Sequence, residues 1–169
     1  MKHYFLVLAL MPLVMGCEIP AQLEKAPDPS KQVIIASNYI GLHESEDRRE
    51  LKYLLGVDPV YYEWCAAFVN SVLEESDITS NRGHEYPLMA RSYLDWGVKV
   101  SPDDIQPGDI VVFPRGTQGW QGHVGFYVRS IMVDDLEYYL ILGGNQSNKV
   151  SIVRYAKHIA LGIRRHEDS

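Results

Sequence analysis

The character of the sequence changes near its middle, at Pro107-Gly108. Before this point, apolar residues recur at helical spacing in short segments that are followed by glycine. After it, runs of β-branched and aromatic residues alternate with Gly, Pro, Asp and Asn, which is typical of strands joined by turns. A helical half followed by an antiparallel meander predicts an α+β domain. We expect five strands, at residues 109–113, 123–128, 138–142, 150–154 and 161–164.

The helical half contains short amphipathic segments with recognisable ends. Ser30 or Asp28 can cap the first helix, and Gly56 ends the second. The third helix opens near Cys65, and its apolar residues at helical spacing form a face that packs into a core. The four predicted helices cover residues 33–40, 47–55, 63–73 and 89–97.

Composition is ordinary for a soluble globular protein. The chain has 169 residues, of which 46% are hydrophobic and 22% charged, so one domain with a real core is expected. The net charge is −6, and Lys and Arg are scattered along the sequence rather than clustered, so there is no sign of a basic surface that would bind nucleic acid. We expect a monomer that binds no nucleic acid.

The N-terminus has the features of an export signal. A short basic start is followed by an apolar run that ends at Gly16-Cys17 and is too short for a comfortable membrane span. The run Val14-Met15-Gly16-Cys17 resembles a bacterial lipobox, in which the cysteine is lipidated and becomes the first residue. The alternative is a secretory or cytosolic N-terminus with an incidental cysteine.

These features divide the chain into three parts. Residues 1–16 are expected to be a lipoprotein signal peptide, and residues 17–30, rich in proline, a tether carrying lipid on Cys17. Residues 31–166 form the predicted folded domain, whose candidate catalytic residues are described next. We therefore expect an exported lipoprotein, attached to a membrane through Cys17.

Cys65 is the candidate nucleophile. It falls in the first turn of the third predicted helix, where free backbone N–H groups and the helix dipole favour a thiolate. If Cys17 carries lipid, Cys65 is also a leftover thiol in an exported protein, which suggests reactivity. The alternative is a small buried apolar residue, a common fate of free cysteine.

Cysteine chemistry also needs a base and a group that orients the base. His123 opens a predicted strand after a glycine, a position that points a side chain into a cleft, although His43 remains a second candidate. Asn145 follows the next strand and could accept the ring N–H of His123, or could simply be a turn residue. No cluster of His, Cys, Asp or Glu has the spacing of metal ligands, so we expect no metal and no cofactor.

Several motifs, in this order, resemble the NlpC/P60 and CHAP superfamily. The resemblance covers roughly residues 33 to 165, and several blocks in the right order are more specific than any single block. It is closest to a small single-domain branch with Trp-Cys-Ala-Ala-Phe-Val and Gly-Gly-Asn-Gln signatures. One departure is Tyr62-Glu63, where this branch usually has Thr-Pro. The matching blocks are Trp64-Cys65-Ala66-Ala67-Phe68-Val69-Asn70, Ala90-Arg91-Ser92-Tyr93-Leu94-Asp95-Trp96-Gly97, Pro107-Gly108-Asp109-Ile110-Val111-Val112-Phe113, Gly122-His123-Val124-Gly125-Phe126-Tyr127-Val128 and Leu142-Gly143-Gly144-Asn145-Gln146-Ser147.

The resemblance implies a papain-like core in which N-terminal helices pack on an antiparallel sheet of about five strands. It implies that Cys65, His123 and Asn145 are the catalytic residues of a peptidoglycan hydrolase. Such an enzyme would cut an amide bond in the stem peptide or at the sugar–peptide junction. Two alternatives stay open: a lipoprotein that binds the wall without cutting it, and an acyltransferase or thioesterase on the same fold.

Three further residues have two interpretations each. Glu63, Trp64 and Trp96 are candidates for the wall of a cleft, but packing is an equally good explanation for each. Asp109 is interpreted as a structural carboxylate in the turn before a strand.

Overall fold

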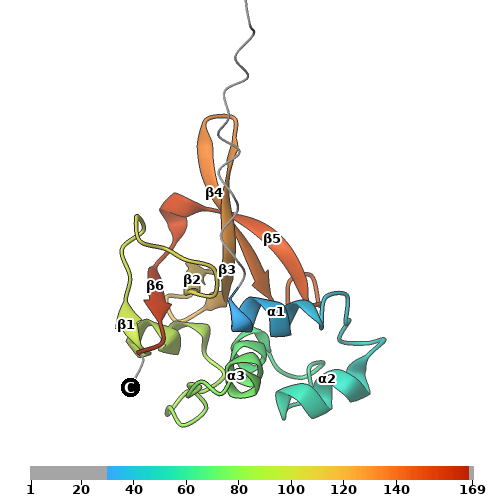
Figure 1. The fold of residues 1–169 in the computed structure, drawn as a ribbon. Helices are drawn as coiled ribbons and strands as arrows, with labels where there is room; N and C mark the ends of the chain where they lie inside the picture. Colours follow the sequence, from blue (N-terminus) through green and yellow to red (C-terminus); the bar gives the residue numbers. More distant parts are fainter. Residues whose placement is uncertain (1–29, 168–169) are drawn as a thin grey trace, which may run out of the picture.

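Helix α3 (Cys65–Glu75) is the central helix of the fold and packs against α1, α2, β3 and β4 (Figure 1). The structure is a computed structural model, and it describes residues 30–167. Every residue of α3 from Cys65 to Leu73 is buried. The predicted apolar face is therefore confirmed, and its burial extends around the whole first part of the helix.

Two short helices precede α3, as predicted. Helix α1 (Lys31–Ser37) is capped by Ser30, whose side chain accepts the N–H of Val33 at 3.4 Å. Helix α2 (Arg48–Leu55) ends at Gly56, which has a left-handed φ of 70°. The short fourth helix is the 3-10 helix η1 (Ala90–Asp95).

The sheet is antiparallel throughout, and its strand order is β1-β6-β2-β3-β4-β5. All five predicted strands are present, and a two-residue strand at the edge makes a sixth. That strand is too short to give a periodic pattern, which is why the sequence did not indicate it. The strands are β1 (Val98–Lys99), β2 (Ile110–Pro114), β3 (Gly122–Val133), β4 (Leu136–Gly143), β5 (Ser151–Ala156) and β6 (Gly162–Arg165), with a 3-10 turn η2 (Lys157–Ile159) before β6.

Strands β3 and β4 form a long hairpin that projects beyond the rest of the sheet (Figure 1). Its turn is the pair Asp134-Asp135, both with positive φ (48° and 61°), as a tight hairpin turn requires. The opposite end of the hairpin, at Gly122 and Gly143, lies beside α3. The hairpin thus carries residues from two distant parts of the sequence to the start of that helix.

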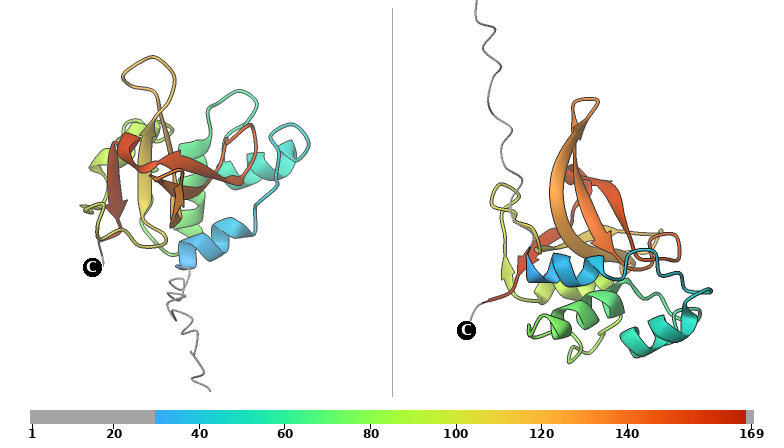
Figure 2. Two further views of the ribbon diagram at one scale, coloured as in Figure 1. Left: turned by 90° about the horizontal axis from the view of Figure 1, so that it is seen from above. Right: turned by 45° about the vertical axis from the view of Figure 1, so that its right-hand side comes forward.

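The two faces of the sheet pack against different layers. Alternate residues of β2 serve the two faces: Ile110 and Val112 belong to the core shared with the helices, and Val111 and Phe113 to a second core on the other face. Figure 2 shows α1, α2 and α3 gathered on one side of the sheet. The second core also contains Val100, Tyr127, Tyr139, Ile141 and Ile163.

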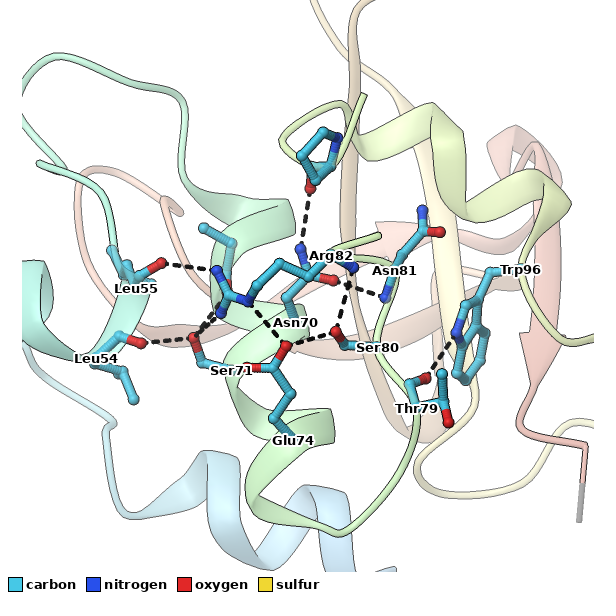
Figure 3. A network of polar contacts seen from close by, with 12 residues as sticks. Leu54, Leu55, Asn70, Ser71, Glu74, Thr79, Ser80, Asn81, Arg82 and Trp96 are labelled. Carbon is cyan, nitrogen blue, oxygen red and sulfur yellow. Dashed lines mark hydrogen bonds and ion pairs between the residues drawn. The ribbon is translucent and has the colours of Figure 1, made fainter. Parts of the chain in front are cut away.

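The connection from α3 to η1 is held by side chains of the helix (Figure 3). Arg82 donates to Glu74 (2.8 Å), to the hydroxyl of Ser71 (3.1 Å) and to the carbonyl of Leu55 (3.2 Å). Asn70 accepts the backbone N–H of Asn81 at 2.9 Å. These hydrogen bonds, of which only the one to Glu74 is exposed, position the loop that borders Cys65.

Asp109 is a structural residue, as expected. Its carboxylate receives two hydrogen bonds of 2.7 Å from Arg165 on β6 and one of 2.8 Å from the N–H of Gln106. It therefore joins the turn before β2 to the last strand.

Some expectations fall outside the described residues. They are the signal peptide at 1–16, lipidation of Cys17, and the tether apart from Ser30. Between residues 30 and 167, no helix has both the length and the apolar character needed to span a membrane.

Candidate active site

Cys65 is the first residue of α3, and its side chain is buried, with 2% exposed. The backbone N–H groups of Ala66 and of Val124, the residue after His123, lie near enough to its thiol to act on the pKa of that thiol. The helix and the start of β3 therefore meet at this thiol. The sequence placed Cys65 correctly at the start of the helix.

Burial raises the pKa of the Cys65 thiol above its ordinary value. The N–H groups of Val124 and Ala66 and the positive charge of Arg115 act in the opposite direction but do not outweigh it. We expected the helix N-terminus to favour the thiolate, and it does act in that sense. The expectation neglected the loss of solvent around the sulfur, which is the larger effect.

His123 lies on β3 opposite Phe113 of β2, and it is buried, with 2% exposed. The ring of Tyr155 stacks on the imidazole at a centroid distance of 5.3 Å, and Phe113 also stacks on Tyr155, at 4.5 Å. These contacts fix the plane of the imidazole. The other groups it meets then decide which nitrogen carries the proton.

Gln146 orients His123. Its Oε1 lies 3.2 Å from His123 Nε2, while its Nε2 donates to the carbonyls of Gly143 (3.2 Å) and Ser151. Because the amide nitrogen donates to carbonyl oxygens, Oε1 must accept a hydrogen bond from the N–H at His123 Nε2. The neutral ring therefore carries its proton on Nε2, and Nδ1 presents a lone pair. Within the described part of the chain, that buried Nδ1 has no hydrogen-bond partner.

Burial lowers the pKa of His123 to about 4, and the positive charge of Arg115 contributes in the same sense. The hydrogen bond from Gln146 acts the other way. At neutral pH the imidazole is therefore uncharged and able to accept a proton at Nδ1. Together with the raised pKa of the thiol, this gives a resting pair of neutral thiol and neutral imidazole.

The structure places Asn145 differently from the expectation. Its Nδ2 donates to Glu63 Oε2 at 2.7 Å, and its backbone is left-handed, with φ of 57°. Asn145 thus lies in a turn with its amide on Glu63, and the hydrogen bond of the histidine ring is made with its neighbour Gln146. A left-handed residue changes the direction of the chain within one step, so adjacent side chains face different groups.

Three hollows lie at or beside Cys65 and His123, and together we call them the cleft. One, of about 290 Å³, contains Cys65 and is bordered by Leu88, Met89 and Trp120. The second, of about 150 Å³, contains His123 and Gln146. The third, of about 210 Å³, lies beside Tyr61, Tyr62 and Asn148. Glu63, Arg115 and Asn145 each border two of these hollows and separate them from one another.

The other sequence candidates now have positions. Trp64 is fully buried and donates to Glu44 at 3.1 Å, so it is a packing residue. Trp96 packs against Tyr93, away from the three hollows, whereas Glu63 does border the cleft. The Nδ1 of His43 accepts the N–H of Ser45 at 3.3 Å, and His43 borders none of the three hollows.

Sequence reasoning missed three residues of the site: Gln146, Arg115 and Tyr155. Gln146 follows Asn145 directly, and both are amides, so the signal was present but ambiguous by one position. Arg115 lies in a loop and Tyr155 on β5, and neither stands in a motif that marks its proximity to His123. Among the described residues, no group of three or more His, Cys, Asp or Glu is placed to hold a metal ion.

Comparison with known proteins gives a family. A sequence model of the CHAP domain matches residues 57–145. The crystal structure of an NlpC/P60 family protein from Bacillus cereus ATCC 10987 aligns with a TM-score of 0.48 and 17% identity, covering 83% of this chain and 41% of that one. The present chain thus spans less than half of that protein, and no curated protein sequence matches it. Because the CHAP match spans more than half of the 169 residues and includes Cys65 and His123, the chain belongs to the CHAP domain family, within the superfamily that its motifs indicated.

Proposed function

We propose that the protein is a cysteine-dependent peptidoglycan hydrolase in which Cys65 is the nucleophile, His123 the base and Gln146 the residue that orients the base. Membership of the CHAP family indicates an amidase or peptidase that acts on peptidoglycan. The bond it cuts would be an amide of the stem peptide or of the sugar–peptide junction.

The observation that carries the proposal is the state of the His123 ring. Nε2 faces the amide oxygen of Gln146, Nδ1 is buried without a partner among the described residues, and the N–H of Val124, the next residue, lies near the Cys65 thiol. A buried nitrogen lone pair without a hydrogen-bond donor costs free energy, so its presence in a folded protein suggests a functional role. Accepting the thiol proton is a role that suits its position.

The reaction follows from these assignments. As the thiol sulfur attacks the amide carbonyl, Nδ1 of His123 takes the thiol proton and then gives it to the leaving amine. Water then attacks the thioester on Cys65 while Nδ1 takes a proton from the water; the C–S bond breaks, the acid product leaves, and Nδ1 returns the proton to the Cys65 sulfur. The backbone N–H of Cys65, in the first turn of α3, would stabilise the oxyanion.

In this proposal Asn145 does not orient the base. Its hydrogen bond to Glu63 holds the edge of the cleft, whereas the amide of Gln146 fixes the tautomer of His123. The two adjacent amides thus have separate roles that mutation can distinguish.

We also propose that the protein is an exported lipoprotein anchored through Cys17. The support is the apolar segment that ends at Gly16-Cys17 and the polar, proline-containing stretch after it. Mass spectrometry of the N-terminal peptide from membranes of expressing cells, beside Cys17→Ser, tests this. A diacylated Cys17 peptide that disappears in the variant is expected. An unmodified, uncleaved N-terminus would contradict the proposal.

The function is tested by mass spectrometry of soluble fragments that the full chain releases from purified peptidoglycan, beside Cys65→Ala. We expect fragments from the wild-type protein alone, and their masses identify the bond. If neither protein releases fragments while both sediment with the wall, the protein is a wall-binding lipoprotein. Release of equal amounts by Cys65→Ala would remove the thiol from the mechanism.

A further inference from the structure

An ion pair between Arg115 and Glu63 borders the hollows that contain Cys65 and His123. Arg115 follows β2, Glu63 precedes α3, and their charged groups approach to 3.6 Å. Arg115 borders both the hollow of Cys65 and the hollow of His123, and Glu63 borders the hollow of Cys65. A substrate that lies against both catalytic groups must therefore meet this pair.

The pair is weak and easily opened. Its separation exceeds that of a hydrogen bond, and the side chains of Arg115 and Glu63 are 40% and 77% exposed. Exposed ion pairs of this kind contribute little to stability because water screens them and two long side chains must be ordered. Separating Arg115 from Glu63 thus has a small energetic cost.

Arg115 is the member of the pair that has no second partner among the described residues. Glu63 Oε2, the same oxygen that faces Arg115, also accepts a hydrogen bond of 2.7 Å from Asn145, which is 5% exposed. Glu63 therefore keeps a buried anchor when the ion pair opens. Between residues 30 and 167, the only ionic contact of Arg115 is the one to Glu63, so its planar fork of donors is available to another partner.

We propose that Arg115 is a substrate carboxylate receptor: it leaves Glu63 to bind a carboxylate next to the scissile amide, so that the cleft selects acidic peptides. This inference rests on the proposed function, since it names the class of substrate for the same site. The guanidinium of arginine matches a carboxylate with two parallel hydrogen bonds, whereas Glu63 now offers it one long contact.

The electrostatics of the site support this role. The charge of Arg115 lowers the pKa of both Cys65 and His123, which places it within electrostatic reach of both reacting groups. The chain has a net charge of −6 and so repels acidic ligands in general. A local cation beside the thiol offsets that repulsion at the point where the substrate must bind.

The direct test compares two alkylating reagents that differ by one carboxylate, iodoacetate and iodoacetamide. The full chain is treated with each, and modification of the Cys65 peptide is followed by mass spectrometry, which separates it from Cys17. The quantity measured is the iodoacetate preference, which is the rate constant with iodoacetate divided by that with iodoacetamide. A change in thiol reactivity affects both rate constants equally and cancels in this ratio. The variants are Arg115→Gln, Arg115→Lys and Glu63→Gln, with Arg129→Gln, an exposed arginine on β3, as the matched control.

We expect the iodoacetate preference to fall on the order of fivefold in Arg115→Gln, as for loss of one exposed charge pair, and to be kept in part by Arg115→Lys. It should rise in Glu63→Gln, because the competing carboxylate is gone, and a misfolded variant would not produce that rise. Arg129→Gln should match the wild-type protein. An unchanged ratio in Arg115→Gln overturns the proposal.

A second experiment uses purified peptidoglycan before and after its carboxyl groups are amidated. We expect the wild-type protein to release fragments more slowly from the amidated wall, mainly through a higher KM, and Arg115→Gln to lose this discrimination. Equal discrimination in Arg115→Gln contradicts the receptor role. If the wild-type protein releases nothing from either wall, the proposed function fails, and the alkylation ratio still decides the role of Arg115.

Discussion

At the scale of single residues, burial keeps both reacting groups uncharged. Burial raises the pKa of Cys65 and lowers that of His123 to about 4. A thiolate–imidazolium pair is therefore not the resting state at neutral pH. The proton has to move from sulfur to Nδ1 when the substrate excludes water and offers a carbonyl to attack.

The first prediction concerns the pH dependence of Cys65 alkylation. Since only the thiolate reacts, a raised pKa means that the rate with iodoacetamide climbs through pH 8 and above. Peptide-resolved mass spectrometry at several pH values measures it. A rate that is already constant from pH 6 upward would show a stable thiolate and contradict the neutral resting pair.

The second prediction separates the two adjacent amides. Gln146→Ala removes the acceptor for His123 Nε2, so the ring can adopt the wrong tautomer, and kcat for wall hydrolysis should fall on the order of 100-fold. Asn145→Ala should lower kcat much less, because its partner is Glu63. Rates of fragment release, with the Cys65 alkylation profile as a check on the site, compare the two. The reverse order of effects would return the orienting role to Asn145.

At the scale of elements, the site depends on how closely the end of β4 approaches α3. Gly144 lies directly after β4, and a Cβ there would come within 2.5 Å of the Trp64 ring and 2.7 Å of Phe68 Cβ. Only glycine permits this contact. It brings the turn that carries Gln146 against the start of the helix that carries Cys65.

The third prediction follows from that contact. Gly144→Ala should lower the free energy of unfolding by about 1–3 kcal/mol, because the added methyl forces α3 and β4 apart. Activity should fall as well, since the separation changes the distance between Cys65 and His123. Urea denaturation measures the first effect. Gly119→Ala is the matched control, because a Cβ there meets no atom within 4 Å, and it should be close to neutral.

At the scale of the whole molecule, one buried histidine couples the fold to pH. His123, buried near the start of β3, is neutral and binds a proton only near pH 4, whereas in the unfolded chain it does so near its ordinary pKa of about 6.5. As the pH falls from about 6.5 to 4, the unfolded chain gains a proton that the folded one does not. Stability is therefore full above this range and is lost across it.

The fourth prediction gives the magnitude of this pH-dependent loss of stability. Between pH 7 and pH 5, His123 should account for a loss of roughly 2 kcal/mol in the free energy of unfolding. In His123→Gln this part of the loss should disappear, whatever its stability at pH 7. Urea denaturation at both pH values gives the double difference. His158→Gln, which changes an exposed histidine, should keep the wild-type difference.

Much of the architecture was determined by local sequence. The helices follow from apolar periodicity and from ends marked by Ser30 and Gly56, and five of the six strands follow from β-branched and aromatic runs. The positions of Cys65 at the start of a helix and of His123 near the start of a strand could be predicted because helix starts and strand starts are local features. The family could be identified because several such blocks occur in order.

Tertiary structure alone decided the partners within the site. Asn145 and Gln146 are adjacent amides, and the left-handed backbone at Asn145 determines which of them faces His123. Likewise, the pKa of Cys65 depends on how completely other elements bury it, and Arg115 reaches the cleft only through the position of its loop. The sequence by itself determines the elements, since propensity and periodicity act over a few neighbouring residues. The chemistry of the site depends on contacts between residues far apart in the chain, which only the packed fold creates.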